Sequence, residues 1–338
     1  MRGPRIDPGG PLGRYAGRMP RRGPLPRLQD LGEFGLIDRI AALAGRRRAP
    51  GVVLGMGDDA AILRLRPHED VVVTTDALVE GVHFRFDQES ARTAGRRALA
   101  ANLSDLAAMG ARPLGFTWAL AAPPSLPART ALELARGLLD LAGRHACPLV
   151  GGNVSRASEV SLTLAALGAV ARGCGLTRAG ARPGDRILVT GALGRAGLER
   201  ARGRVRHVGE PRLRAGRALA RAGLATACID ISDGLLADLG QLCRASRVGA
   251  LLDARLVPRA RNLGAAARRA SLDPLALALG GGEDYELLFT VAPRAPAPAR
   301  LARLLDVAVT EIGAVTERGL RVAGAPAGQA HATGWRHF

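Results

Sequence analysis

The sequence predicts an α+β protein made of two domains. Its 338 residues can form two hydrophobic cores, because 47% of them are hydrophobic. Segments with the period of a strand and segments with the period of a helix follow one another in a mixed order, which favours α+β domains over one strictly alternating sheet. A Pro-Gly-Asp turn at 183–185 precedes an apolar run and indicates where the second unit begins.

We divide the chain into three segments. Residues 1–30 contain many Gly, Pro and Arg residues without periodicity, and we expect a disordered extension there. Residues 31–172 are expected to form an N-terminal domain and residues 173–338 a C-terminal domain, joined near 170–178.

The spacing of hydrophobic residues predicts the helices and strands of the N-terminal domain. After Glu33, the run FGLIDRIAAL has the spacing of a helix. Three β-branched valines in VVVTTD (71–76) predict a buried strand. Residues 89–109 predict a long helix that Gly110 closes. Beyond it we expect a strand at 113–122, a helix at 127–145 and a strand at 161–170.

The C-terminal domain is expected to begin with an apolar strand from Arg186 to Thr190. Helices are predicted at 194–202 and 212–222. The sequence IDISDG (229–234) predicts a strand end that opens a helix over 234–245. The runs VGALLD and YELLFTV predict further strands at 248–253 and 285–291.

All of the cationic side chains other than histidine are arginine. The chain has 48 of them against 30 Asp and Glu residues, and no lysine. A P-loop needs the lysine of its GK[ST] motif and a protein kinase needs its strand lysine, so both are excluded. A Schiff-base mechanism is excluded for the same reason, because no side-chain amine is available. Any catalysis must therefore rest on other groups.

The net charge of +18 and the pI near 11.5 do not by themselves predict nucleic-acid binding. The arginines are scattered, and aromatic residues, which stack on bases, make up only 3% of the chain. We interpret the arginines as a solvated surface whose long side chains cover apolar area. A basic nucleic-acid-binding protein is the alternative; it would show salt-sensitive retention on DNA but leaves the pattern of acidic residues unexplained.

Cysteine usage and hydropathy predict a soluble, cytoplasmic protein that does not contact a membrane. Cys147, Cys174, Cys228 and Cys243 have no CxxC spacing and lie in apolar runs, so we expect reduced core residues rather than disulfides or a zinc site. No apolar run reaches the length of a membrane span, and the N-terminus lacks the apolar region of a signal peptide.

Acidic side chains recur in apolar or glycine-rich surroundings. Burying a carboxylate without compensation is costly, so acids placed repeatedly in such sequence are expected to hold cations. Magnesium ions that hold phosphates are the expected cations. The segments are GMGDDAAIL (55–63), VVVTTDALVEGVHF (71–84), ANLSDLAAMG (101–110), GGNVSR (151–156), IDISDG (229–234) and GGEDYEL (281–287).

Two of these segments deliver oxygen donors beside a turn or a strand end. In GMGDDA, glycines let the backbone turn tightly near a phosphate, beside Asp58 and Asp59; the alternative is an ordinary surface turn. VVVTTD places Thr74, Thr75 and Asp76 together at its end. Hydroxyl and carboxylate oxygens are hard ligands that suit Mg²⁺.

Two further segments place acids at the boundaries of helices. Asn102 and Asp105 lie three residues apart and share one helix face beside an apolar stripe, where a helix–helix hydrogen bond is the alternative. In IDISDG, Ser232 or Asp233 can cap the following helix. Capping explains one acid but not both Asp230 and Asp233.

His83 and a glycine run have ordinary explanations when taken alone. A single histidine beside Phe84 is more often structural than functional. The run TGALGRAG spaces its glycines as GxxGxxG rather than GxGxxG, and no acidic ribose partner follows a second strand, so we do not predict a dinucleotide site.

In their order along the chain, these motifs resemble those of the thiamine-monophosphate kinases. That family belongs to a superfamily with aminoimidazole ribonucleotide synthetase, selenophosphate synthetase and the hydrogenase-maturation dehydratase. The resemblance covers about 32–338; each motif is weak alone, but the ordered set is specific. The motifs are GEF (32–34), GDDAA, TTDALVEGVHF, NLSDLAAMGARP, LTRAGARPGD, IDISDGL and GGEDYEL.

The resemblance implies an enzyme that transfers the γ-phosphoryl group of ATP to thiamine monophosphate and forms thiamine diphosphate. It implies two α/β domains of the aminoimidazole ribonucleotide synthetase-like type. The N-terminal domains of two subunits would share a β-barrel, with ATP and Mg²⁺ near the junction, so a homodimer is expected. Direct in-line transfer assisted by several Mg²⁺ ions requires no protein nucleophile, because the acceptor is an anionic phosphate oxygen.

The resemblance also assigns roles to individual residues. The implied metal ligands are Asp59, Thr74, Thr75, Asp76, Asp105, Asn153, Asp230 and Asp233. The implied ATP contacts are Arg178, Ser232 and a turn at Gly152 and Asn153, and the implied substrate contacts are His83, Glu283 and Trp335. Arg178 would offer a guanidinium fork to phosphate oxygens, and the ring of Trp335 could stack on the substrate.

One position departs from the family pattern, and two alternatives stay open. Many relatives read GGD where this chain has Asn153, and an amide oxygen ligates Mg²⁺ without adding negative charge, so the number of metals is open. The alternatives are an aminoimidazole ribonucleotide synthetase-like ligase and a non-catalytic nucleotide-binding relative. A selenophosphate synthetase would need a reactive N-terminal cysteine or selenocysteine with a lysine, and the hydrogenase-maturation relative ends in a functional cysteine. This chain has neither feature and ends in WRHF.

Overall fold

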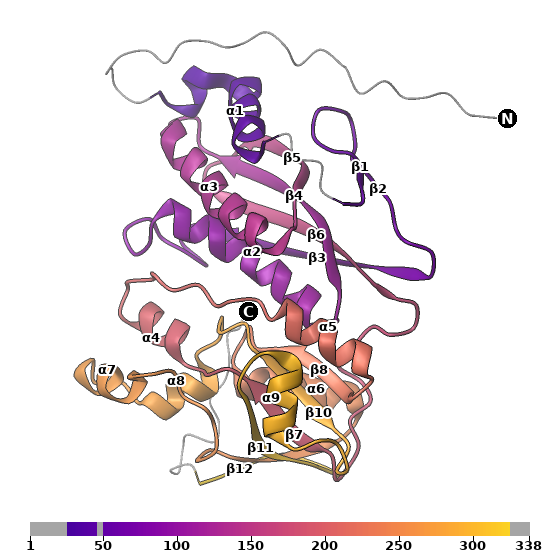
Figure 1. The fold of residues 1–338 in the computed structure, drawn as a ribbon. Helices are drawn as coiled ribbons and strands as arrows, with labels where there is room; N and C mark the ends of the chain where they lie inside the picture. Colours follow the sequence, from indigo (N-terminus) through magenta and orange to yellow (C-terminus); the bar gives the residue numbers. More distant parts are fainter. Residues whose placement is uncertain (1–25, 46–49, 325–338) are drawn as a thin grey trace, which may run out of the picture.

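The α+β organisation predicted from the sequence is present in the computed structural model, which describes residues 26–45 and 50–324 (Figure 1). One sheet has four strands and another has six, and both carry helices. Most of the extension predicted for 1–30 lies outside the described residues, but helix α1 (Leu28–Ala44) already begins within it. No helix in the described ranges is both long and apolar enough to cross a membrane.

The N-terminal sheet is antiparallel except at one edge. Its strands lie in the order β3-β6-β4-β5, and only β4 and β5 run parallel. Helices α2 and α3 cover one face, with α1 beyond them (Figure 1). The bounds are β3 (Glu69–Val79), α2 (Ala91–Ala108), β4 (Arg112–Ala122), α3 (Ala128–His145), β5 (Leu149–Arg156) and β6 (Ser161–Ala171), with a separate hairpin of β1 (Val52–Leu54) and β2 (Ile62–Leu63).

Strand β3 is not buried as the valine run predicted. It lies at the edge of the sheet, and Val71 and Val73 are 48% and 63% exposed. Successive side chains of a strand point to opposite faces, so the valines and Thr75 share the face away from α2, whereas Thr74 and Asp76 point toward α2. The prediction failed because β-branching indicates a strand but not how many of its faces are covered.

The C-terminal sheet has the strand order β12-β9-β11-β7-β10-β8, and only β12 and β9 run parallel. Its strands are β7 (Arg186–Thr190), β8 (Ala225–Asp230), β9 (Gly249–Asp253), β10 (Leu287–Val291), β11 (Val309–Thr316) and β12 (Leu320–Ala323). Its helices are α4 (Arg195–Ala201), α5 (Leu213–Ala222), α6 (Leu235–Ser246), α7 (Leu263–Arg269), α8 (Pro274–Gly280) and α9 (Pro298–Leu305).

The two faces of the C-terminal sheet serve different cores. Ile229 and Leu288 pack with α6, α7 and α8 in a core of their own. Cys228, Leu287 and Phe289 point the other way and belong to a hydrophobic cluster that continues through α5 and α2 into the N-terminal sheet. The domains therefore share buried surface, and α2 lies at their junction (Figure 1).

The cysteines are free thiols. Cys147, Cys228 and Cys243 are buried, as expected for small core residues. Cys174 is exposed, so that expectation was wrong for it, because it lies in the turn that follows β6 rather than in an element.

Helices α2 and α3 cross closely because each contributes a glycine to the contact. A Cβ atom at Gly95 would overlap the carbonyl oxygen of Leu134 on α3. A Cβ atom at Gly137 would overlap the carbonyl oxygen of Arg92 on α2. Backbone, unlike a flexible side chain, cannot move aside cheaply. The position of α2 over the sheet therefore depends on these two glycines.

We expect Gly137→Ala to lower the free energy of unfolding by about 1–3 kcal/mol, because the added methyl group forces α2 and α3 apart. Gly143→Ala on the same helix is the control: nothing lies within 4 Å of its added Cβ. That change should raise stability by up to about 1 kcal/mol through helix propensity. Urea unfolding of both variants measures the difference, and a stabilising Gly137→Ala would contradict the close crossing.

Candidate active site

Strand β3 and helix α2 bring together three of the residues singled out in the sequence. Thr74 and Asp76 lie on the face of β3 that α2 covers, and the Thr74 hydroxyl donates a hydrogen bond to Asp105 on α2. Asp76 also shares a hydrogen bond with Asp105. Thr75 points to the opposite face, and its hydroxyl donates to the carbonyl oxygen of Leu164, 2.8 Å away.

The same helix also contacts the C-terminal sheet. The Ser104 hydroxyl donates to a carboxylate oxygen of Asp230, at the end of β8, over 2.6 Å. Both side chains are buried, at 0% and 2% exposure. Because Ser104 and Asp105 are adjacent on α2, they place Asp230 close to Asp76 and Asp105. Ser104 was not identified from the sequence, although it is part of the NLSD motif.

The loop between Asp230 and α6 is held by a side chain that sequence reasoning also missed. The backbone N–H groups of Ser232, Asp233 and Gly234 all donate to one carboxylate oxygen of Asp238, at 3.1, 3.1 and 3.0 Å. The predicted capping of this helix by Ser232 or Asp233 is wrong, because Gly234 is the N-cap residue and Asp238 reaches back from the first turn. An acid at this position also suits the positive end of the helix dipole.

The acidic cluster (Asp76, Asp105, Asp230 and Asp233) is unfavourable to ionise in the chain alone. Burial, then the charge and the hydrogen bond of Asp105, raise the pKa of Asp76 to about 6, and Asp233 adds to the effect. Burial and the charge of Asp105 raise the pKa of Asp230 to about 8. Burial raises the pKa of Asp105 as well. Arg178 acts in the opposite direction on Asp105 and Asp230 without cancelling the shift.

The side chains of the acidic cluster are chemically suited to bind a divalent cation. Its donors are hard oxygens, the ligands that Mg²⁺ prefers, and burial together with neighbouring carboxyls raises the pKa values of Asp76 and Asp230, which a bound cation would oppose. Within residues 26–45 and 50–324, no three His, Cys, Asp or Glu side chains are already arranged to hold a metal ion. Binding would therefore require these side chains to turn toward the ion.

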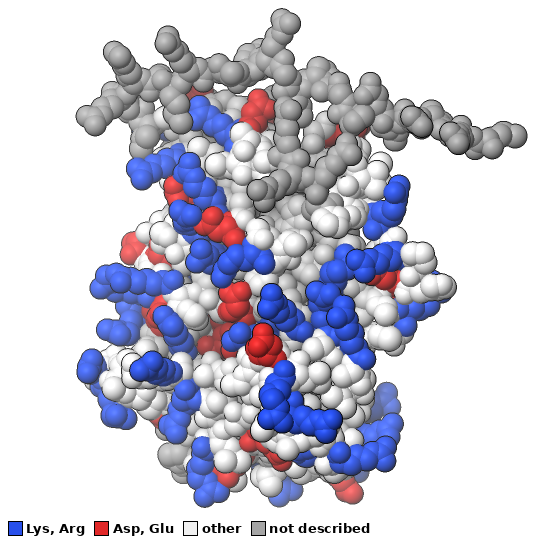
Figure 2. All heavy atoms as spheres, in the orientation of Figure 1, with Lys and Arg blue, Asp and Glu red and all other residues white. Residues whose placement is uncertain are grey.

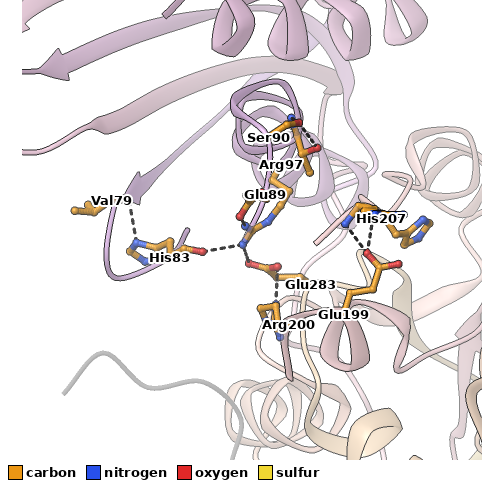
Figure 3. A network of polar contacts seen from close by, with 11 residues as sticks. Val79, His83, Glu89, Ser90, Arg97, Glu199, Arg200, His207 and Glu283 are labelled. Atoms are coloured by element: carbon orange, nitrogen blue, oxygen red, sulfur yellow. Dashed lines mark hydrogen bonds and ion pairs between the residues drawn. The ribbon is translucent and has the colours of Figure 1, made fainter. Parts of the chain in front are cut away.

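A second polar group lies at the other end of α2 (Figure 3). Arg97 forms ion pairs with Glu89 and with Glu283, the latter over 2.7 Å, and also donates to the backbone oxygen of His83 at 3.0 Å. Arg200 pairs with Glu283 at 2.5 Å. We call Glu89, Arg97, Arg200 and Glu283 the Arg–Glu network. It brings both described substrate-contact candidates, His83 and Glu283, to the domain junction.

Other residues implied by the resemblance lie apart from the acidic cluster. Asp59 is exposed in the loop of the β1–β2 hairpin. Asn153 is exposed on β5, which is three strand spacings, about 14 Å, from β3 across the sheet. Trp335 lies outside the described residues.

The turn expected at Gly152 and Asn153 is wrong, because both residues belong to strand β5. Glycine is required at 152 since a Cβ atom there would overlap the carbonyl oxygen of Trp118 on β4. Two glycines in succession were read as a turn, whereas the structure uses one of them for close contact between strands.

Comparison with known families identifies the class of protein. The N-terminal domain of AIR synthase related proteins matches residues 57–170, and the C-terminal domain of the same proteins matches residues 182–324. The chain is therefore a two-domain protein of the AIR synthase related type. The fold is shared with Escherichia coli HypE, a hydrogenase maturation protein, at a TM-score of 0.69; the 19% sequence identity indicates the fold alone.

Within this class the chain belongs to the thiamine-monophosphate kinase family. It is 39% identical over 294 residues to the thiamine-monophosphate kinase of Mycobacterium tuberculosis H37Rv and 40% identical over 299 residues to that of Escherichia coli K12. Both matches cover 83% of this chain and 87% of the relative.

Solved structures of the family agree with this assignment. The kinase from Stenotrophomonas maltophilia K279a has a TM-score of 0.75 and 39% identity, covering 86% of this chain and 96% of that one. A structure of AaThiL complexed with AMPPCP and TMP has a TM-score of 0.68 and 31% identity, covering 92% of this chain and 99% of that one.

We expect Asp76→Asn to stabilise the chain when divalent cations are removed with EDTA. The pKa of Asp76, raised to about 6 in the folded chain, lies above the ordinary value of 3.8. The folded chain therefore binds more protons than the unfolded chain between these pH values, and its stability falls as the pH rises through them. At pH 8 the variant should be more stable by about 1–3 kcal/mol, and near pH 4 the difference should vanish.

Thermal unfolding across pH measures this effect. Asp87→Asn is the control, because Asp87 is exposed and Arg85 holds its pKa below the usual range, so its removal should not stabilise at any pH. Excess Mg²⁺ should stabilise the wild type more than Asp76→Asn, since a ligand stabilises the state that binds it. Equal responses of the two chains to Mg²⁺ would argue against a cation at Asp76.

Proposed function

We propose that this chain transfers the γ-phosphoryl group of ATP to thiamine monophosphate and forms thiamine diphosphate. The observation that carries the proposal is the convergence of Asp76, Asp105 and Asp230 from both domains, in a chain of the thiamine-monophosphate kinase family. The relative AaThiL forms a complex with AMPPCP and TMP, which supports an ATP-like donor and that acceptor.

The chemistry suits a site without lysine or a protein nucleophile. The acceptor is a phosphate oxygen that is anionic at neutral pH, so it needs little help from a general base. The main difficulty is to bring two polyanions together in line. Bound Mg²⁺ ions supply charge neutralisation and alignment of the phosphates. The exposed Arg178 adds a guanidinium fork for phosphate oxygens, and Ser232 is proposed as a further ATP contact.

Hydrogen bonds within the chain orient the residues that we propose as cation ligands. Thr74 orients Asp105, Ser104 orients Asp230, and Asp238 fixes the loop that carries Asp233. Each hydrogen bond leaves other carboxylate lone pairs for a metal ion. We propose Thr74 and the four acids of the acidic cluster as Mg²⁺ ligands.

Thr75 and Asn153 lie on the other face of the N-terminal sheet. The register across the sheet aligns Asn153 on β5 with Ala77 on β3, through Ala119 and Thr163 on the two strands between them. Asn153 therefore points to the same side of the sheet as Thr75 and Val73. Asp59, Thr75, Gly152 and Asn153 stay proposed for metal or ATP. They would complete the site only with a second subunit or after movement of the hairpin loop.

We propose a cytoplasmic homodimer in which two N-terminal sheets close into a barrel. The sheet face that no described helix covers exposes Val71 and Val73 on an edge strand, and exposed β-branched residues at a sheet edge are typical of an interface. Basic side chains are instead spread over the visible surface and interspersed with acidic ones (Figure 2). On this face the basic side chains form no continuous stripe of the kind that binds nucleic acid.

We propose that His83 and Glu283 contact the thiamine part of the substrate, together with Trp335. His83 accepts a hydrogen bond from the backbone N–H of Val79 at its Nδ1, 3.0 Å away, which fixes the orientation of the ring. Glu283 faces the same junction from the C-terminal domain (Figure 3). A carboxylate is suited to the positively charged thiazolium ring of thiamine.

Purified chain should convert thiamine monophosphate to thiamine diphosphate in the presence of ATP and Mg²⁺. We expect Asp76→Asn to lower kcat by about 10²–10³-fold, because it weakens the proposed Mg²⁺ site and so reduces the positive charge that would stabilise the transferred phosphoryl group. Oxidation of the products to fluorescent thiochromes followed by separation measures the conversion, and Asp87→Asn should retain full rate.

Two other outcomes would replace the proposal. Binding of ATP without turnover would indicate a nucleotide-binding relative. Turnover of formylglycinamidine ribonucleotide in place of thiamine monophosphate would indicate the ligase.

The dimer should dissociate when a charge is placed on the uncovered sheet face. We expect Val73→Arg to yield monomers in light scattering coupled to size exclusion, because two arginines would meet in an apolar interface. Leu304→Arg is the control, because Leu304 is 47% exposed but lies on α9 of the other domain. A Val73→Arg chain that stays dimeric would place the interface elsewhere.

A further inference from the structure

Arg97 is a buried member of a charged network that crosses the domain junction. It lies on α2 and is 2% exposed. Its guanidinium group reaches acceptors on both domains: Glu89 and the His83 carbonyl oxygen on the N-terminal side, and Glu283 on the C-terminal side (Figure 3). A planar guanidinium can hold several acceptors in fixed directions, whereas an ammonium group cannot.

Glu283 is fixed by its backbone as well as by its side chain. Its φ of 56° lies in the left-handed region, which a non-glycine residue adopts only when its surroundings require it. Its N–H donates to the carbonyl oxygen of Ser232 over 2.8 Å. Arg97 and Arg200 bind its two carboxylate oxygens separately, at 2.7 and 2.5 Å, and they keep its pKa low although burial opposes this.

The network contains as many arginines as glutamates. Two arginines face two glutamates, and Arg97 divides its charge between Glu89 and Glu283. Glu283 is therefore held as a carboxylate by two guanidinium groups, one on each of its oxygens. Each of its oxygens retains a lone pair for a ligand, and its side chain is 24% exposed.

Helix α2 relates this network to the acidic cluster. Arg97 and Asp105 are eight residues apart on one helix, a separation of about 12 Å along its axis. One end of the helix therefore organises the phosphoryl-transfer residues and the other end organises Glu283. An elongated substrate with a phosphate at one end and a positively charged ring at the other matches that arrangement.

We propose that Arg97 is a positioning residue for the substrate. It acts through Glu283, which it orients toward the cationic ring of thiamine monophosphate, and it does not contact the substrate itself. Arg200 supports the same carboxylate from the other side. The inference rests on the proposed kinase activity and on the proposed contact of Glu283 with the thiazolium ring.

The test separates the KM for thiamine monophosphate from the KM for ATP. Arg97→Lys keeps a charge but loses the planar fork, and we expect at least a tenfold rise in the KM for thiamine monophosphate with kcat and the KM for ATP changed less than twofold. Arg200→Met should give a smaller rise of the same kind. Arg92→Met is the control, because Arg92 lies on the same helix but pairs with Asp140 at the surface.

A double-mutant cycle tests whether Arg97 acts through Glu283. Glu283→Gln alone should raise the same KM, and adding Arg97→Lys to it should change the KM less than twofold further, since the carboxylate to be oriented is gone. Independent, multiplying effects of the two changes would overturn the inference. If Arg97→Lys does not fold, Arg97→Gln and Glu283→Gln, alone and combined, make the same comparison, because glutamine at 97 keeps a planar hydrogen-bond donor without the charge.

The outcomes separate this inference from the proposed function. A wild-type chain without turnover of thiamine monophosphate would remove the proposed function and the inference together. The other case is a wild type that converts thiamine monophosphate while Arg97→Lys raises both KM values equally or lowers only the melting temperature. That result would support the proposed function but overturn the positioning role of Arg97.

Discussion

The structure depends on one helix that contacts both sheets. Asp105 on α2 faces β3 of the N-terminal sheet, and its neighbour Ser104 donates a hydrogen bond to Asp230 at the end of β8. Close approach is possible because small residues line the contact: a Cβ atom at Gly216 on α5 would overlap the carbonyl oxygen of Ala107 on α2. The distance between the acidic residues of the two domains is therefore set by helix packing and not by a flexible linker.

The acidic cluster shows how function and stability oppose each other here. Burial and mutual repulsion raise the pKa of Asp76 to about 6 and that of Asp230 to about 8, so ionising these carboxyls lowers the stability of the fold. In the Arg–Glu network, by contrast, burial raises the pKa of Glu89 to about 7 while Arg97 opposes the shift. The carboxyls of the acidic cluster are therefore mainly surrounded by other carboxyls, whereas each glutamate of the Arg–Glu network has an arginine as its ion-pair partner.

The sequence predicted most helices and strands up to the end of α6, because long amphipathic runs such as 89–109 have a clear period. It also located Asp76, Asp105 and Asp230, since acids in apolar surroundings stand out. It missed Asp238, Ser104 and Arg97, because nothing in their local sequence reveals contacts with residues brought close by the fold. The short elements α7, α8 and α9 were missed as well, being too short to show a period.

The loop that carries Glu283 and the loop that carries Asp233 are parts of a single backbone unit. Glu283 N–H donates to Ser232, Tyr285 N–H to Ile231, and Ile231 N–H to Glu286. A Cβ atom at Gly282 would overlap this partner loop. A chimera that took only residues 280–286 from a relative would therefore lose the fit between these two loops. The two loops lie about fifty residues apart in sequence, and we expect their residues to be inherited together.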